Sequence, residues 1–150
     1  MRRITALLLL CVILIYLIPI PTLADENRSK IIPLDNGCYL KIEVLSIYMR
    51  ESQRITGRKT YTYYSSSGIV CWQAILNGVF LYTGTNATCT GSSCDVNIIN
   101  TDWYTVGKSS GMLGNKATAE VTMGQKVLGI TVQKIPISMT LTCDANGNLS

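Results

Sequence analysis

The stretch IVCWQAILNGVFLYTG, residues 69–84, constrains the fold more than any other part of the chain. Its residues alternate between two faces, as in a β-strand, where successive side chains point to opposite sides. Both faces contain apolar residues, which predicts a long central strand. The pair Asn77-Gly78 predicts a bend, because a glycine inside a strand often marks a bulge or a close approach. One face carries Trp72, Ala74, Leu76, Gly78, Phe80 and Tyr82.

Other runs with the same period lie on both sides of this segment, and turn sequences such as SSSG and GMLGN separate them. Pro136 has no N–H to donate to a neighbouring strand, which indicates an edge strand or a bulge. We count six to eight strands and no convincing amphipathic helix, so we predict an all-β fold, an antiparallel β-sandwich of immunoglobulin-like or jelly-roll-like type. The predicted inward faces are Cys38, Leu40, Ile42 and Val44; Ala117, Ala119, Val121 and Met123; and Ile135, Ile137, Met139, Leu141 and Cys143.

Residues 1–24 have the pattern of a secretory signal peptide. Two arginines precede the apolar run ITALLLLCVILIYLI, and the small residues Thr22 and Ala24 would lie just before a cut. The next residues, 25–36, are polar and contain a proline, which predicts a flexible leader. The sequence therefore predicts a secreted protein with one domain over residues 37–150.

Two alternatives for the N-terminus remain. The apolar stretch 4–23 is nearly long enough to span a bilayer and, uncleaved, would anchor the protein in the membrane. Cys11 would be the lipidated residue of a lipoprotein, but apolar residues continue for seven positions after it. Without residues 1–24, 11 Lys and Arg stand against 9 Asp and Glu, a net charge of about +2. This charge is too small to indicate binding to nucleic acid or to anionic lipid, so we expect contact with a membrane only through the N-terminal export segment.

Cysteines suggest a covalent role, because an exported chain meets an oxidising environment. Five remain after residue 24, so at least one would be unpaired or join two chains, and spacing alone does not choose the pairs. The alternatives are zinc binding and thiol redox chemistry. The chain has no histidine and no second close cysteine pair for zinc, and it has no C-x-x-C motif. The five are Cys38, Cys71, Cys89, Cys94 and Cys143.

No constellation of catalytic residues stands out. Without histidine, the chain cannot form a Ser-His-Asp or Cys-His arrangement, and its acidic residues are scattered. We therefore expect a protein that is not an enzyme and needs no metal or cofactor; a hydrolase would require two acids in one deep pocket. Exposed aromatic residues on a sheet are how many sandwiches bind ligands, whereas the alternative is that they fill the core. The candidates are Tyr61, Tyr63, Trp103 and Tyr104.

Residues 54–150 resemble a group of small secreted proteins of Gram-positive, often gut-dwelling, bacteria that has no assigned activity. The likeness rests on GRKTYTYYSSSG, the tryptophan at 72, NATCT, DWYTVGKSSGMLGN, KATAEVTM and VLGITVQKIPISMTLTCDANGNLS. It implies export and a β-rich fold, and it supplies no catalytic residues. The cysteines of its A-T-C-T and L-T-C segments match Cys89 and Cys143, which the resemblance makes the expected disulfide. Cys71 and Cys94 are the second expected pair, which leaves Cys38 unpaired or linking a dimer.

The sequence does not fix a molecular function. The leading hypothesis is a secreted binding module at the cell envelope or in the medium, with a protein or an envelope carbohydrate as partner. A secreted antibacterial or signalling effector is the second hypothesis. A carboxylate-based hydrolase is the third.

Overall fold

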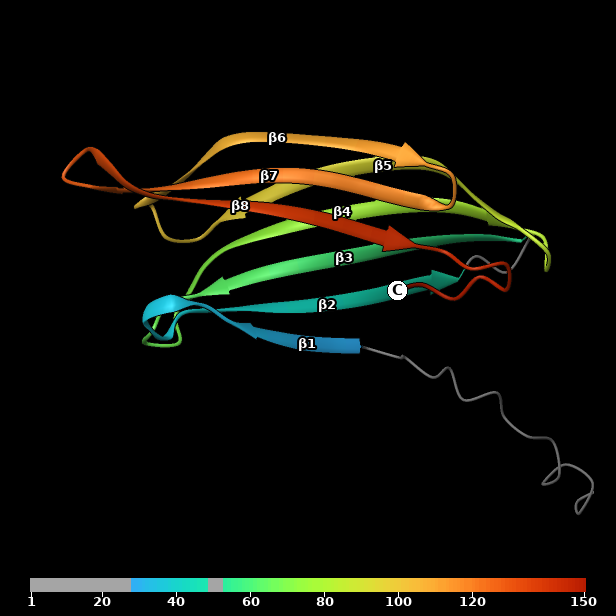
Figure 1. The fold of residues 1–150 in the computed structure, drawn as a ribbon, viewed down its shortest axis with the longest axis horizontal. Helices are drawn as coiled ribbons and strands as arrows, with labels where there is room; N and C mark the ends of the chain where they lie inside the picture. Colours follow the sequence, from blue (N-terminus) through green and yellow to red (C-terminus); the bar gives the residue numbers. More distant parts are fainter. Residues whose placement is uncertain (1–27, 49–52) are drawn as a thin grey trace, which may run out of the picture.

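A computed structural model describes residues 28–48 and 53–150 as two packed β-sheets (Figure 1). The predicted signal peptide lies outside these residues, as does Cys11. Within them, no helix is long and apolar enough to cross a membrane. The strands are β1 (Arg28–Pro33), β2 (Tyr39–Tyr48), β3 (Arg54–Tyr64), β4 (Val70–Tyr82), β5 (Ala87–Ile98), β6 (Trp103–Leu113), β7 (Lys116–Val127) and β8 (Ile130–Thr142), with a short 3-10 turn, η1 (Asp35–Gly37).

The protein is an all-β sandwich of eight antiparallel strands, as predicted. One sheet has the order β1-β2-β3-β4-β5 and the other has the order β6-β7-β8. Every strand pairs with its neighbour in sequence, and the chain crosses to the second sheet only once, between β5 and β6. The connections therefore form a meander, and they differ from the Greek-key connections of immunoglobulin and jelly-roll domains.

The core lies between the sheets and follows the alternation in the sequence. On β4, Trp72, Ala74, Leu76 and Phe80 are fully buried, and the residues between them are half-buried on the outer face. The predicted inward residues of β7 and β8 are all buried except Ile135, which is partly buried against the core. The hydrophobic pattern thus sets which face of each strand meets the other sheet.

Gly78 lies at a close approach of the two sheets. A Cβ atom at this position would lie 2.7 Å from the Phe80 ring and 3.0 Å from the Cβ of Ala117 on β7. The register between β4 and β5 shifts directly afterwards, between Val79 and Phe80. Val79 pairs with Gly91 and Phe80 pairs with Cys89, so the extra residue of this bulge is Thr90 on β5. Of the two features that a glycine inside a strand can mark, Gly78 therefore shows the close approach.

Three sequence expectations need correction. Part of the predicted leader is strand β1, because Ile32 packs against the core while Pro33 lies at the end of an edge strand, where a missing N–H is tolerated. The run VLGITV is not one strand: Leu128 and Gly129 form the turn between β7 and β8. The polar residues GSSCD at 91–95 do not interrupt the strand that begins with ATCT: residues 87–98 form the single strand β5.

Candidate functional site

The two sheets differ in width, so part of the larger sheet has no strand opposite it. The smaller sheet ends at β8, which packs against β3 and β4 (Figure 1). The inner faces of β1 and β2 extend beyond β8. Among the described residues, the side of β8 that faces away from β7 pairs only with the C-terminal residues.

The free edge of β8 presents backbone groups from every second residue. Thr142 exchanges two backbone hydrogen bonds with Ser150, N···O 2.9 and 3.0 Å, on the side away from β7. Backbone direction alternates along a strand, so Thr140, Ser138 and Pro136 point to the same edge. The N–H that Pro136 lacks would therefore lie on the free edge, and the pairing with β7 loses nothing. This confirms the edge position predicted from the proline.

Two hollows lie on the inner face of the larger sheet near this edge, and we call them together the trough; the wider one is mainly apolar, whereas polar side chains line much of the narrower one. Its wider part has a volume of about 390 Å³ and its narrower part about 140 Å³. Tyr61 lines the first part and Tyr63, the next inward residue of β3, lines the second, so the two parts follow one another along β3. The wider part is lined by Ser29, Lys30, Ile32, Ile42, Val44, Lys59, Tyr61 and Ser150, and the narrower by Leu34, Asp35, Asn36, Cys38, Tyr63, Gln133 and Ile135.

Lys59 bridges the two sheets at the end of the trough nearest Ser150. Its Nζ donates a hydrogen bond to the backbone carbonyl of Thr140, N···O 2.7 Å. Partial burial lowers the pKa of this amine, because removal from water disfavours the ammonium form. The wider part of the trough contains no acidic side chain. Its surface combines aliphatic and aromatic side chains with two lysines and Ser150, the residue that pairs with Thr142 of β8.

The predicted surface aromatics occupy three different environments. Tyr61 is half-buried and lines the trough, as a ligand residue would, and burial raises its pKa. Tyr63 and Trp103 are only 4% exposed, so they belong to the core. Their rings pack 4.9 Å apart, and Tyr63 stacks on Trp72 at 5.1 Å. Tyr104 is partly buried, and its hydroxyl forms a hydrogen bond with the hydroxyl of Thr131, O···O 2.8 Å.

All five described cysteines are free thiols in this structure. Cys89 and Cys143 are neighbours: their N–H groups donate to the carbonyls of Gly114 and Asn115, successive residues of the β6–β7 turn. Burial, Asp144 and the nearby Cys89 thiol raise the pKa of Cys143 to about 11. The predicted pair Cys89–Cys143 is thus brought together without being bonded.

The second predicted pair, Cys71–Cys94, does not fit the register of the sheet. Cys94 lies opposite Leu76, five residues along β4 from Cys71. At about 3.3 Å per residue this offset is about 16 Å, well beyond the Cα separation of a disulfide. Cys71 lies instead near Cys38, whose thiol contributes to a raised pKa at Cys71 after the larger effect of burial. Cys38 itself lines the narrow part of the trough.

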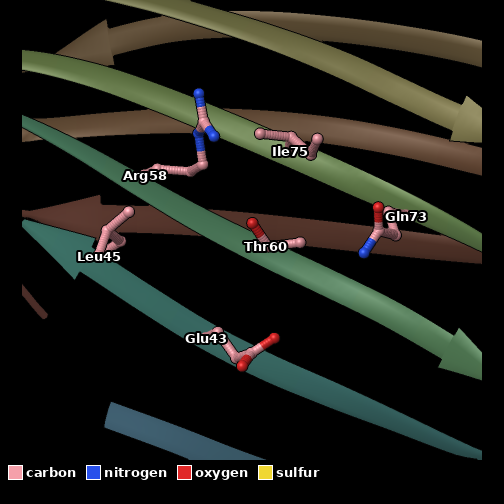
Figure 2. Close-up of a pocket in the computed structure, with 6 residues that line it drawn as sticks. All are labelled: Glu43, Leu45, Arg58, Thr60, Gln73 and Ile75. Atoms are coloured by element: carbon pink, nitrogen blue, oxygen red, sulfur yellow. The ribbon is translucent and has the colours of Figure 1, made fainter. Parts of the chain in front are cut away.

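A second hollow lies on the outer face of the larger sheet, over β2, β3 and β4 (Figure 2). Its volume is about 300 Å³, and Leu45 and Ile75 form its apolar part. Arg58 extends across this face and donates to the side-chain oxygen of Asn77, N···O 3.1 Å, which turns its guanidinium away from Glu43 (Figure 2). The hollow is shallow and no aromatic side chain lines it, so it lacks the stacking surface expected of a sugar site.

The acidic residues of the described chain do not converge. Glu43 is the only acid in the outer hollow, Asp35 is the only acid in the narrow trough, and the wide trough has none. Within residues 28–48 and 53–150, no three cysteine or acidic side chains are grouped to hold a metal ion. None of these three hollows therefore brings together the two acids that a carboxylate-based hydrolase requires.

Comparisons with known proteins add no relative. No protein family matches the chain, and neither a curated protein nor a solved structure matches it. The fold and the site therefore define the class of protein by themselves: an all-β sandwich with sheets of five and three strands, open along the free edge of β8.

Two of the predicted ligand aromatics line the trough, Tyr61 in its wider part and Tyr63 in its narrower part, and the other trough residues were not predicted as ligand residues. Ile42 and Val44 appear in the sequence as ordinary core positions, and only the unequal widths of the sheets leave them beside an open edge. The proline at 136 was the signal that could have led to the site, because it marked the edge strand.

Proposed function

We propose that this protein is an exported binding module that holds an extended peptide segment in the trough, as an added strand on β8. One observation carries the proposal: β8 is an edge strand, its residues Gln133 and Ile135 line the narrower part of the trough, and Ser150, which pairs with Thr142 of β8, lines the wider part. A strand paired with β8 would satisfy the edge and would also cover Tyr61, which is half-buried, and the 8% of Ile42 and of Val44 that is exposed. Addition of a strand to an exposed sheet edge is a common mode of peptide recognition.

The chain already shows such pairing at one end of the edge. Leu149 forms an isolated antiparallel bridge with Cys143, and Ser150 pairs with Thr142. Leu149 is buried and would contact a Cβ placed on Gly57 of β3, so its side chain enters the space between the sheets. A bound peptide would continue the same arrangement along β8 toward Gln133, with alternate side chains inserted into the trough.

The trough also predicts which peptides would bind. Alternate side chains of the ligand would face Ile42, Val44 and Tyr61, so these positions should be aliphatic or aromatic. Among the residues that line the wide part, only Lys30 and Lys59 have charged side chains. We therefore expect a preference for ligands without a basic side chain at the inserted positions, because a second cation there would be partly desolvated and repelled.

A single backbone donor provides a sharp test. Ser138→Pro would remove the free-edge N–H of residue 138 while leaving the pairing with β7 intact, as Pro136 does two residues earlier. The serine hydroxyl also donates to Glu120, O···O 2.7 Å. Ser138→Ala is therefore the matched control, because it removes the same hydroxyl and keeps the N–H.

The experiment selects peptides from a phage-displayed library against the exported protein and measures their affinity for the three forms by calorimetry. We expect Ser138→Pro to weaken binding about tenfold, from one lost hydrogen bond and the altered edge, and Ser138→Ala to leave it unchanged. Equal affinities for Ser138→Pro and the natural chain would contradict strand addition. Strand addition would also be contradicted if only substitutions on the outer face of the larger sheet weakened the binding of a selected peptide.

Export and disulfide formation belong to the same proposal. An oxidising compartment would join Cys89 to Cys143, which lie against one turn, and would leave Cys94 without a partner within reach on β4. A secreted effector would use the same groove to recognise a target protein. Inhibition of neighbouring cells by the natural protein, but not by Ser138→Pro, would favour that role over a passive binding module.

A further inference from the structure

We infer that the tip of the β7–β8 hairpin is a second interaction surface, independent of the trough, and that it inserts into the interface of an anionic lipid bilayer. The tip consists of Val127, Leu128, Ile130 and Val132, all exposed, with Leu128 at 98% and Ile130 at 69%. It forms the far left end of the molecule in Figure 1. We refer to these four residues as the apolar tip.

The tip projects beyond the rest of its sheet. β6 begins at Trp103, which pairs with Gln125 of β7, so the residues that follow Gln125 have no strand of β6 beside them. The hairpin is anchored just below this point, where the N–H of Lys126 donates to the carbonyl of Asp102, N···O 2.7 Å, and its Nζ lies 4.5 Å from the centre of the Tyr104 ring. Because its base is anchored and its apolar end projects, this hairpin could insert its tip into a lipid bilayer.

Leu128 is unfavourable in this turn for two separate reasons. Its φ of 52° lies in the left-handed region, where a leucine is strained and where hairpin turns usually carry Asn, Asp or Gly. Its side chain is also almost completely in water. A residue that improved folding alone would be polar and compatible with this conformation, so the leucine points to a contact outside the chain.

The shape and charge of the tip favour a membrane over a protein partner. The tip is a projecting hairpin turn, and none of the three hollows described above includes its residues, whereas a fluid bilayer interface accommodates a projection. Lys126 and Lys134 flank the apolar residues, and no acidic residue occurs between positions 121 and 143. Apolar residues flanked by cations are the combination that binds anionic lipid surfaces. Asp102, near the base, is the nearest acid along the pairing.

The test places a fluorescent reporter at the tip of the exported protein. Leu128→Trp replaces one apolar side chain by another, and Leu113→Trp is the matched control, because Leu113 is equally apolar and 73% exposed at the β6–β7 turn. Each form is mixed with vesicles of phosphatidylcholine alone, or with one third phosphatidylglycerol, with and without brominated acyl chains. Circular dichroism checks that both variants keep the β fold.

We expect the emission of Leu128→Trp to shift to shorter wavelength and to be quenched by brominated lipid only with the anionic vesicles. Leu113→Trp should show neither change, and Leu128→Asn should lower vesicle partition at least about fivefold. No shift in Leu128→Trp, or an equal response in the control, would overturn the inference. A shift that appears without lipid as protein concentration rises would also overturn it, since the partner would then be a second copy.

Discussion

The ammonium group of Lys59 donates to the carbonyl oxygen of Thr140 across the gap between the sheets, N···O 2.7 Å. This contact closes the free edge of β8 at the end of the trough nearest the C-terminal residues. It also leaves the edge from Pro136 to Ser138 as the part open to a ligand strand. The same contact gives stability a pH dependence of predictable sign.

Lys59→Met should remove that pH dependence and little else. Partial burial lowers the pKa of Lys59 below its ordinary value of 10.5. Between the two pKa values the unfolded chain binds more protons than the folded one, so the natural protein should gain stability as pH rises through this window. We therefore expect the unfolding free energy of the natural protein to increase relative to that of Lys59→Met as the pH rises from 8 to 11, measured by urea denaturation. A pH-independent difference would contradict this reading; Lys116→Met, at an exposed position, is the control.

Gly78→Ala should test the close contact between the sheets at Gly78 and Ala117. The new methyl group would lie 2.7 Å from the Phe80 ring and 3.0 Å from the Cβ of Ala117, so the strands must separate or the ring must move. We expect a loss of about 1–3 kcal/mol in unfolding free energy, as for other overpacked cores. Gly107→Ala is the control, since a Cβ there meets nothing within 4 Å, and it should change stability by less than about 0.5 kcal/mol.

Much of the fold could be predicted because the buried faces follow period-two alternation. The inward residues of β4, β7 and β8 were identified from sequence, and the edge position of β8 was identified from Pro136 alone. The turn at Leu128-Gly129 was missed because a leucine at positive φ carries none of the usual turn signals. The candidate site was largely missed because it depends on how many strands each sheet has, a long-range property that no local pattern encodes.

The aromatic residues show the same limit. Tyr61 and Tyr63 lie two positions apart on one face of β3 and both line the trough, yet Tyr61 is half-buried and Tyr63 is only 4% exposed. Alternation assigns both to the inner face, but the rings of Trp72 and Trp103, which lie on other strands, pack on Tyr63 and bury it. Trp103 was a plausible surface residue by sequence and is buried because it packs on Tyr63 and Trp72.

Trp72→Phe should be better tolerated than Trp103→Phe. Among the described residues, the buried Nε1 of Trp72 has no hydrogen-bond partner, whereas the Trp103 side chain lies close enough to the Cys71 thiol to lower its pKa slightly against the larger effect of burial. Removing the unpaired donor of Trp72 relieves a desolvation cost, while removing the Trp103 indole takes away a favourable polar neighbour of Cys71. We expect urea denaturation to show Trp72→Phe at least about 1 kcal/mol less destabilised than Trp103→Phe. The reverse order would show that the lost volume at Trp72 dominates.

Leu128→Asn should stabilise the protein while weakening any function of the apolar tip. Asparagine tolerates the left-handed conformation that Leu128 adopts at φ 52°, and it does not expose an apolar side chain. We expect a gain of about 0.5–1 kcal/mol, measured by urea denaturation. Leu113→Asn is the matched control, because Leu113 is also exposed but is not at positive φ, and it should leave stability nearly unchanged. Loss of stability in Leu128→Asn would mean that the leucine serves the fold itself.

Cys89 and Cys143 should form the disulfide of the oxidised protein, because both lie against the Gly114-Asn115 turn. The bridge would close a loop of over 50 residues, and the chain-entropy estimate gives about 4 kcal/mol, less any strain. Peptide mapping of exported protein, with and without reduction, should find this pair and should not find Cys71 joined to Cys94.

In the reduced protein at pH 8, the pKa of about 11 leaves only about one Cys143 in a thousand as thiolate, so iodoacetamide should label it slowly. Cys94→Ser should leave the mapped bridge and the stability unchanged; rapid labelling of Cys143 or a bridge through Cys94 would show that the end of β8 opens in solution.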